Sequence, residues 1–154
     1  MLKRMKSEHI LTVTDSKYVN VFYGDLLKSP PARYNEAMLA AIEQTFGTKV
    51  TRIGSKEVTE DKDIQNLWHN ESREAKQIAQ RWIRAAQKMT YTIEPEIVRS
   101  AKLYLAMKML MEKHGATAMA FHIRALVKDA RPEDMVFPAL AVSEFQLHNT
   151  VAKC

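Results

Sequence analysis

The sequence predicts an α/β fold with an open, mainly parallel sheet and flanking helices. Segments rich in β-branched and aromatic residues alternate along the chain with segments whose apolar residues recur at helical spacing. Because parallel strands need long crossover connections, this alternation favours a parallel sheet. The chain has 154 residues, of which 46% are hydrophobic and 27% are charged, as in an ordinary globular protein.

The first third of the chain predicts two strands with a helix between them. Residues 18–24 (YVNVFYG) are rich in β-branched and aromatic residues and end in glycine. Two prolines precede the predicted helix 32–46, whose apolar residues fall on one face. Gly47 ends this helix, and residues 49–54 (KVTRIG) form the second strand.

The middle of the chain predicts a polar connection and an amphipathic helix. Residues 55–70 are polar and poorly periodic, so we expect an exposed connection anchored by Leu67 and Trp68, with Ser55 capping a short turn. Residues 71–88 form a helix with an acidic first turn and one apolar stripe. The stripe consists of Ala75, Ile78, Ala79, Trp82, Ile83 and Ala86.

A second, longer helix begins at Pro95 and runs to about His114, where Gly115 ends it. Its apolar residues cover more than half of its circumference, which indicates burial on more than one side. Residues 116–123 (ATAMAFHI) are apolar with little alternation, so we expect a strand buried on both faces.

The last segment predicts one more helix and one more strand. A polar loop over 124–136 leads to Pro138, which begins a helix that runs to about Leu147. We expect a turn at 148–149 and a final strand at 150–154 (TVAKC).

Composition narrows the function classes. The net charge is +5, but basic residues are spread over the whole length with acidic residues among them, so we expect no nucleic-acid partner. No apolar run approaches the roughly 20 residues that span a bilayer, which argues against a membrane protein. The basic start lacks the apolar core of a signal peptide, and a single cysteine fits a reducing compartment, so we predict a cytoplasmic protein.

Motifs that carry chemistry are sparse. The sequence contains no Gly-rich phosphate loop, no HExxH and no CxxC. The five histidines lie far apart, and none has a ligand-like neighbour at short spacing; they are His9, His69, His114, His122 and His148. A metal site assembled from distant residues stays open, but the sequence indicates none.

Two single residues each allow two interpretations. His122, inside an apolar strand, could contact a ligand at the carboxyl end of the sheet. We favour a histidine satisfied by a backbone partner or facing the loop, because no acidic or metal-ligating residue is close in sequence. Cys154 could be a nucleophile, but we favour a small buried apolar residue.

Two short segments are also open to two interpretations. The methionine-rich stretch 105–111 (LAMKMLM) could form an adaptable groove for a partner, but helical spacing favours core filling. Arg124, Lys128 and Arg131 could hold an anionic group, and a polar loop of mixed charge explains them equally well.

The segments 100–123 (SAKLYLAMKMLMEKHGATAMAFHI) and 137–154 (FPALAVSEFQLHNTVAKC) resemble the middle of L-fucose isomerase-like proteins. In that family a long helix leads into a buried strand, and a later helix leads to a strand ending in Cys-Glu-x-Asp. The segment 46–60 (FGTKVTRIGSKEVTE) resembles the end of the family's first domain. The resemblance extends over roughly residues 18–154.

This resemblance implies partial Rossmann-like domains. Residues 1–88 would be the end of an N-terminal α/β domain and residues 89–154 the start of a second, unless both form one compact unit. The family implies an oligomeric, metal-dependent aldose–ketose isomerase acting on a sugar such as L-fucose or L-arabinose. A divalent cation, usually Mn²⁺, would hold two oxygens of the open-chain sugar through Glu, Asp and His ligands.

The family's ligands do not carry over onto this chain. Cys154 matches the cysteine of Cys-Glu-x-Asp, so the glutamate would be the next residue and the other ligands would lie further downstream. His122 and Ala139 stand where the family usually has cysteine, and the His148–Asn149 region replaces a glycine. We therefore expect no catalytic, cofactor-binding or metal-binding residue in this chain, and no bound Mn²⁺.

Two hypotheses of different classes follow. The first is a truncated or divergent sugar isomerase, inactive alone, that works as a homo-oligomer or with a missing complementary segment. The alternative is a small, non-catalytic α/β binding or interaction domain. A basic nucleic-acid-binding domain, with salt-sensitive binding, is a third and less favoured interpretation.

Overall fold

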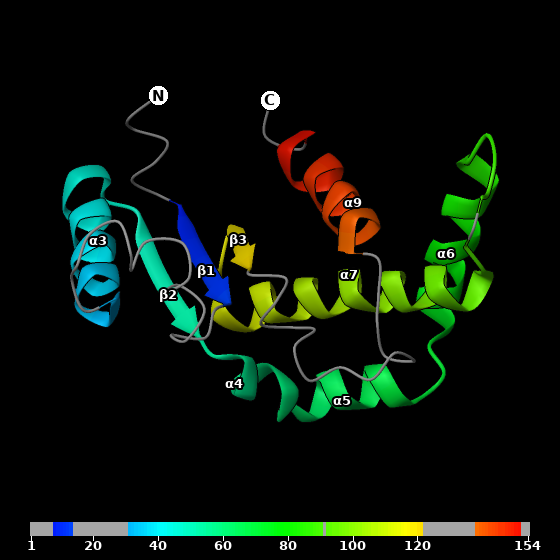
Figure 1. Cartoon of the computed structure of the whole chain (residues 1–154), viewed down its shortest axis with the longest axis horizontal. Helices are drawn as coiled ribbons and strands as arrows, with labels where there is room; N and C mark the ends of the chain where they lie inside the picture. The colour runs from blue at the N-terminus through cyan, green and yellow to red at the C-terminus, as the bar shows by residue number, and fades with distance from the viewer. Residues whose placement is uncertain (1–7, 14–30, 91, 122–137, 152–154) are drawn as a thin grey trace. The chain divides into compact units, whose positions relative to one another are not determined.

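The computed structural model describes residues 8–13, 31–90, 92–121 and 138–151. These residues form an α/β fold with helices and an open three-stranded, all-parallel sheet, as the sequence predicted (Figure 1). Along the chain the elements are β1 His9–Val13, α3 Pro31–Phe46, β2 Lys49–Ile53, α4 Ser55–Thr59, α5 Lys62–His69, α6 Arg73–Ala85, α7 Glu94–His114, β3 Ala118–Phe121 and α9 Pro138–Val151.

The described residues fall into two compact units, each made of two stretches of chain. Unit 1 comprises residues 1–60 and 110–128, and unit 2 comprises residues 61–109 and 129–154. The domain boundary predicted at residue 88 falls inside unit 2, and the assignment of the two halves to separate domains of an isomerase stays a prediction.

The sheet of unit 1 is centred on β1, with β2 on one side and β3 on the other (Figure 1). Both pairings are parallel, since residues 10–13 of β1 lie in order opposite 50–53 of β2 and 118–121 of β3. Leu11 is fully buried and Val13 is 2% exposed, while the alternate residues of β1 are half-buried. This alternation is the period of two that a strand imposes on its side chains.

The central strand β1 is the element that the sequence analysis missed. In the sequence, Ile10, Leu11 and Val13 are too few for the apolar core of a signal peptide, and no strand is predicted there. Its burial comes from pairing with β2 and β3, whose partner residues lie 40 and 108 positions away in sequence, and no local pattern reveals such a partner. The strand predicted at 18–24 lies outside the described residues.

Helix α3 confirms the predicted helix and its end. It begins at Pro31, a residue suited to the first helical position, and stops before Gly47, whose φ of 68° is the left-handed conformation that glycine tolerates. The Glu43 carboxylate accepts a 2.8 Å hydrogen bond from the Val50 amide, which ties the end of α3 to the start of β2.

The stretch 55–70 is mostly exposed, as predicted, but it forms the helices α4 and α5 instead of an irregular connection. Glu57 accepts a hydrogen bond from the Gly54 amide at the start of α4. Asp61 caps α5 by accepting bonds from the amides of Asp63 and Ile64, at 3.0 and 3.2 Å. This capping starts α5, and Ile64, Leu67 and Trp68 then recur at helical spacing, with Ile64 buried and the other two half-buried.

The two longer helices of the middle region were predicted correctly. Helix α6 is capped by Ser72, whose hydroxyl accepts a 3.1 Å bond from the Ala75 amide, and it is shorter than predicted at both ends. Helix α7 is buried on several sides, since the consecutive residues Leu103–Met107 are all at most 9% exposed. Met107 and Met111 are buried and Met109 is half-buried, so the core-filling interpretation of the methionine-rich stretch is confirmed for Met107 and Met111. Gly115, with φ 60°, ends α7.

Two predictions for the last third need correction. Strand β3 exists, but Ala120 is exposed and Ala118 and Met119 are half-buried, so burial on both faces is wrong for these residues. The reason is that β3 lies at one side of the described sheet. Helix α9 continues through the predicted turn at 148–149 to Val151, because no glycine or proline interrupts it there. Residues 152–154 of the predicted final strand lie outside the described part.

Within the described residues, no helix is both long enough and apolar enough to cross a membrane.

Shortening a buried side chain of the central strand β1 tests the role of this strand in the sheet. We expect Leu11→Ala to lower the free energy of unfolding by about 2–5 kcal/mol, because Leu11 is fully buried and its loss leaves a cavity. Ile93→Ala is the control, since Ile93 is 59% exposed and should change stability by less than about 0.5 kcal/mol. Urea titration measures both, and equal losses would contradict the central role of β1.

Candidate functional site

The candidate site is one face of helix α6 in unit 2. Ala75 and Ala79 are fully buried on one side of this helix, and the polar residues fall on the opposite side because they recur every three or four positions. These polar residues line an open depression of about 450 Å³, and we call them the α6 basic face: Arg73, Lys76, Gln77, Gln80, Arg81 and Arg84.

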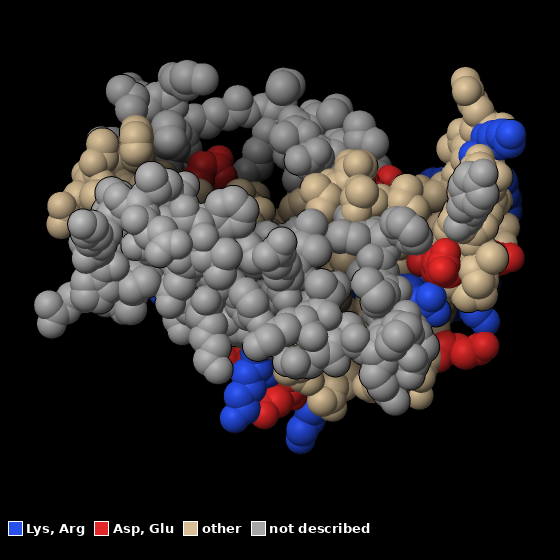
Figure 2. Space-filling model, in the orientation of Figure 1, with Lys and Arg blue, Asp and Glu red and all other residues tan. Residues whose placement is uncertain are grey.

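The α6 basic face carries four cations and no carboxylate. Two of these cations form ion pairs with carboxylates among the described residues, and two do not. Lys76 pairs with Glu71 at 2.9 Å, and Arg81 pairs with Glu144. Exposed Arg73 and Arg84 make no hydrogen bond or ion pair with any described residue. Figure 2 shows Lys and Arg side chains exposed in the region of α6, at the right of the view, with acidic side chains beside them.

Glu144 fixes one side of this face. Its side chain is 9% exposed, and it accepts a hydrogen bond from Arg81 and a 2.9 Å bond from the Trp82 indole nitrogen. A buried carboxylate is tolerated when it is paired and hydrogen-bonded in this way. Because Glu144 belongs to α9, the contact joins α6 to α9 within unit 2 and orients the Arg81 end of the face.

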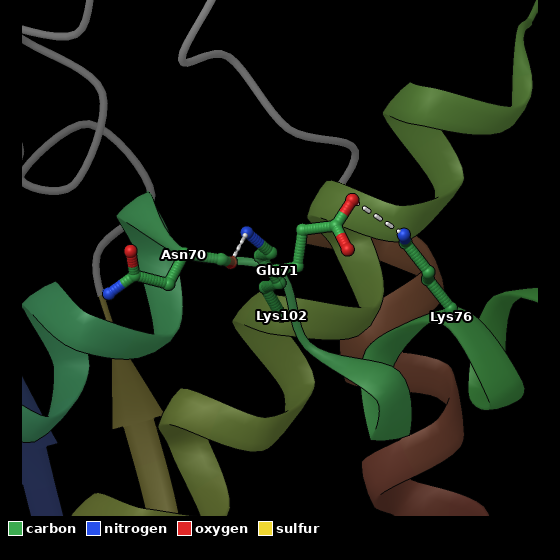
Figure 3. A network of polar contacts seen from close by, with 4 residues as sticks. All are labelled: Asn70, Glu71, Lys76 and Lys102. Atoms are coloured by element: carbon green, nitrogen blue, oxygen red, sulfur yellow. Dashed lines mark hydrogen bonds and ion pairs between the residues drawn. The ribbon is translucent and has the colours of Figure 1, made fainter.

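A second polar cluster of unit 2 surrounds Lys102 (Figure 3). The Lys102 ammonium donates hydrogen bonds to the carbonyls of Trp68 and Asn70, at 2.9 and 2.8 Å, where α5 ends. Cations stabilise such helix ends because the last carbonyls lack helical partners. Burial lowers the pKa of Lys102, and Glu71 opposes this shift. The hydrogen bond from Lys76 lowers the pKa of Glu71.

A third cluster lies in unit 1, around His9. The His9 ring lies 3.1 Å from the Gly115 carbonyl through Nδ1 and 2.8 Å from the Thr51 hydroxyl through Nε2. In the neutral ring Nδ1 donates, since a carbonyl only accepts, and Nε2 accepts from the hydroxyl. This cluster sits at the amino ends of the parallel strands, whereas ligands of open α/β sheets bind at the carboxyl ends. We therefore assign His9 a structural role.

The residues singled out from the sequence are not gathered into a site. Several of them lie outside the described residues, namely His122, Arg124, Lys128, Arg131 and Cys154. Of the other histidines, His69 is exposed at the end of α5 and His114 is half-buried at the end of α7. Among the residues that the structure describes, no group of three or more His, Cys, Asp or Glu side chains could hold a metal ion.

The α6 basic face was not predicted, although its signal is present in the sequence. The apolar stripe of REAKQIAQRWIRA predicts the helix, but its cations look dispersed when only their spacing along the chain is considered. On a helix, residues 73, 77 and 84 point in nearly the same direction. The polar residues opposite an apolar stripe therefore form one surface, even when they are spread along the sequence. The acidic residue between them, Glu74, falls on the flank of the face.

Comparison with protein-family models, with curated proteins and with solved structures finds no match for this chain. The side chains of the α6 basic face and their contacts are therefore the basis for assigning a function.

Removing the Lys102 ammonium tests its structural role. We expect Lys102→Met to lower the free energy of unfolding by about 1–3 kcal/mol, because it leaves two carbonyls at the end of α5 without their charged donor. Lys108→Met on the same helix is the matched control. Its ammonium lies 6.0 Å from the Tyr104 ring centroid, a contact worth about 0.5–1 kcal/mol. Thermal or urea unfolding distinguishes the two, and a smaller loss for Lys102→Met would refute this role.

Proposed function

We propose that this chain is a non-catalytic α/β binding domain whose α6 basic face contacts an anionic partner. The observation that carries the proposal is the pair of exposed arginines, Arg73 and Arg84, which share one side of α6 and make no hydrogen bond or ion pair with any described residue. Lys76 and Arg81 add positive charge beside them. A cationic surface of this kind raises the local concentration of anions and accelerates their association.

The contacts of the other polar clusters support the choice of the α6 basic face as the binding surface. His9 is held by Gly115 and Thr51, Lys102 by two carbonyls, and Glu144 by Arg81 and Trp82. Each of these clusters joins elements of its own unit, which gives it a structural task. Within the α6 basic face, Gln80 also donates a 2.5 Å hydrogen bond to Glu94 of α7, whereas Arg73, Gln77 and Arg84 make no such contact among the described residues.

The isomerase hypothesis stands as the second candidate. The resemblance of residues 100–123 and 137–154 and the all-parallel sheet support it. However, Thr150 and Val151, where the family would have its final strand, belong to helix α9. We therefore place the binding domain first, and we keep homo-oligomerisation and a cytoplasmic location as parts of the proposal.

Retention on immobilised heparin, a sulfated polyanion, tests the binding proposal. We expect the double variant Arg73→Gln/Arg84→Gln to elute at clearly lower salt than the unmodified protein, because it removes both uncommitted cations of the face. Lys49→Gln/Lys62→Gln is the control, since it removes two exposed cations from other elements. Equal elution of the two variants would show that retention reflects net charge alone, and the proposal would fall.

The isomerase hypothesis has its own test. We expect the chain alone to bind Mn²⁺ no more tightly than weak surface carboxylates do, and to leave L-fucose and L-arabinose unchanged, because no residue of this chain matches the Glu, Asp and His ligands of the family. Calorimetric titration with Mn²⁺ and an assay for ketose formation measure both. Formation of a ketose would overturn the non-catalytic assignment.

A further inference from the structure

We propose that the anionic partner of the α6 basic face is double-stranded DNA, contacted mainly through its phosphate backbone. This inference rests on the proposed function, because it identifies the partner of the same surface. It departs from the expectation of no nucleic-acid partner, which was based on the linear spread of the basic residues. In the folded helix, four cations of α6 share one face.

The first argument is the chemistry of the central line of the face, formed by Arg73, Gln77 and Arg84. All three side chains are exposed, and none bonds to a described residue. The guanidinium groups are planar donors that match phosphate oxygens in pairs, and a glutamine amide also donates to phosphate. A line of donors therefore suits a partner that offers a row of acceptor oxygens.

The second argument is the shape of this surface. At about 1.5 Å per residue, the line from Arg73 to Arg84 is about 16 Å long, with Gln77 about 6 Å from its start. Lys76 and Arg81 lie on the two flanks of that line. A helix of about 10–12 Å diameter enters the major groove of B-form DNA, which is about 12 Å wide. Lys76 and Arg81 then lie toward the two backbones while each stays paired with a carboxylate, so the phosphate contacts are assigned to Arg73 and Arg84.

The third argument is that the α6 basic face lacks the apolar and aromatic side chains that bind proteins and single-stranded nucleic acids. A protein partner is usually held by aromatic or apolar anchors at the centre of the interface, and every residue that lines this depression is basic or an amide. Single strands are held by aromatic rings on which bases stack; the α6 aromatic residue, Trp82, instead bonds Glu144 and contacts the Tyr104 ring. Duplex RNA presents a major groove too narrow for a helix.

Fluorescence anisotropy with a labelled 20-base-pair duplex DNA of mixed sequence tests the inference across a range of NaCl concentrations. We expect the logarithm of the association constant to fall with the logarithm of salt with a slope between about −2 and −4, since each neutralised phosphate contributes about −0.9. Arg73→Gln or Arg84→Gln should each reduce the slope by about 1, equally for different sequences. The double variant should bind on the order of tenfold more weakly.

The variants are chosen so that loss of binding is not loss of folding. Arg73 occupies the first turn of α6, where a cation is unfavourable, so Arg73→Gln should not weaken the helix. Gln77→Glu is a second variant that places a negative charge in the line, and its helical content is checked by circular dichroism. Lys49→Gln/Lys62→Gln again serves as the control with the same change of charge.

The alternative outcomes separate this inference from the proposed function. Equal or tighter binding to duplex RNA, to single-stranded DNA or to poly-L-glutamate, with the same dependence on Arg73 and Arg84, would overturn the choice of duplex DNA and leave the proposed function standing. Binding to duplex DNA that the double variant and the control weaken equally would overturn both. No binding to any of these polyanions would also overturn both.

Discussion

The burial of α7 is the constraint on which unit 2 depends. Five consecutive residues, Leu103–Met107, are buried, so this helix needs cover on more than one side. The Tyr104 ring meets Trp82 of α6 and Phe145 of α9 edge-on, with centroids 6.4 and 6.3 Å away. Such pairs bury large apolar areas and prefer this geometry. Because α6 must turn Trp82 toward this cluster, its arginine-rich side is left on the surface.

Buried charge explains why the polar residues divide into two kinds. Glu144 and Lys102 are largely or partly withdrawn from water, and each is held by hydrogen bonds to groups of its own unit. A buried charge without partners would destabilise the fold by several kcal/mol or more, so the fold requires these contacts. Arg73 and Arg84 are exposed, so water solvates their charges and the fold does not require them to have a partner. Their chemistry is available for contacts with another molecule.

A binding role and an α/β scaffold are compatible, because fold does not fix function. The parallel sheet of unit 1 and the helices of unit 2 provide rigid elements, and a rigid helix presents its side chains at fixed spacing. The isomerase resemblance concerns the order of elements along the chain, whereas the α6 basic face concerns which side chains share a surface. These two kinds of information are independent.

The sequence by itself determined the elements whose signals are local. Pro31 and Gly47 bound α3, Gly115 ends α7, and the apolar spacing of α6 and α7 predicted both helices, because caps and periodicity act over a few residues. Tertiary structure decided the remainder. The strand HILTV is buried only because two distant strands flank it, and four cations spread along twelve positions form one surface only because α6 is a helix with its other side covered. Pairing and burial depend on long-range contacts, which a single sequence does not display.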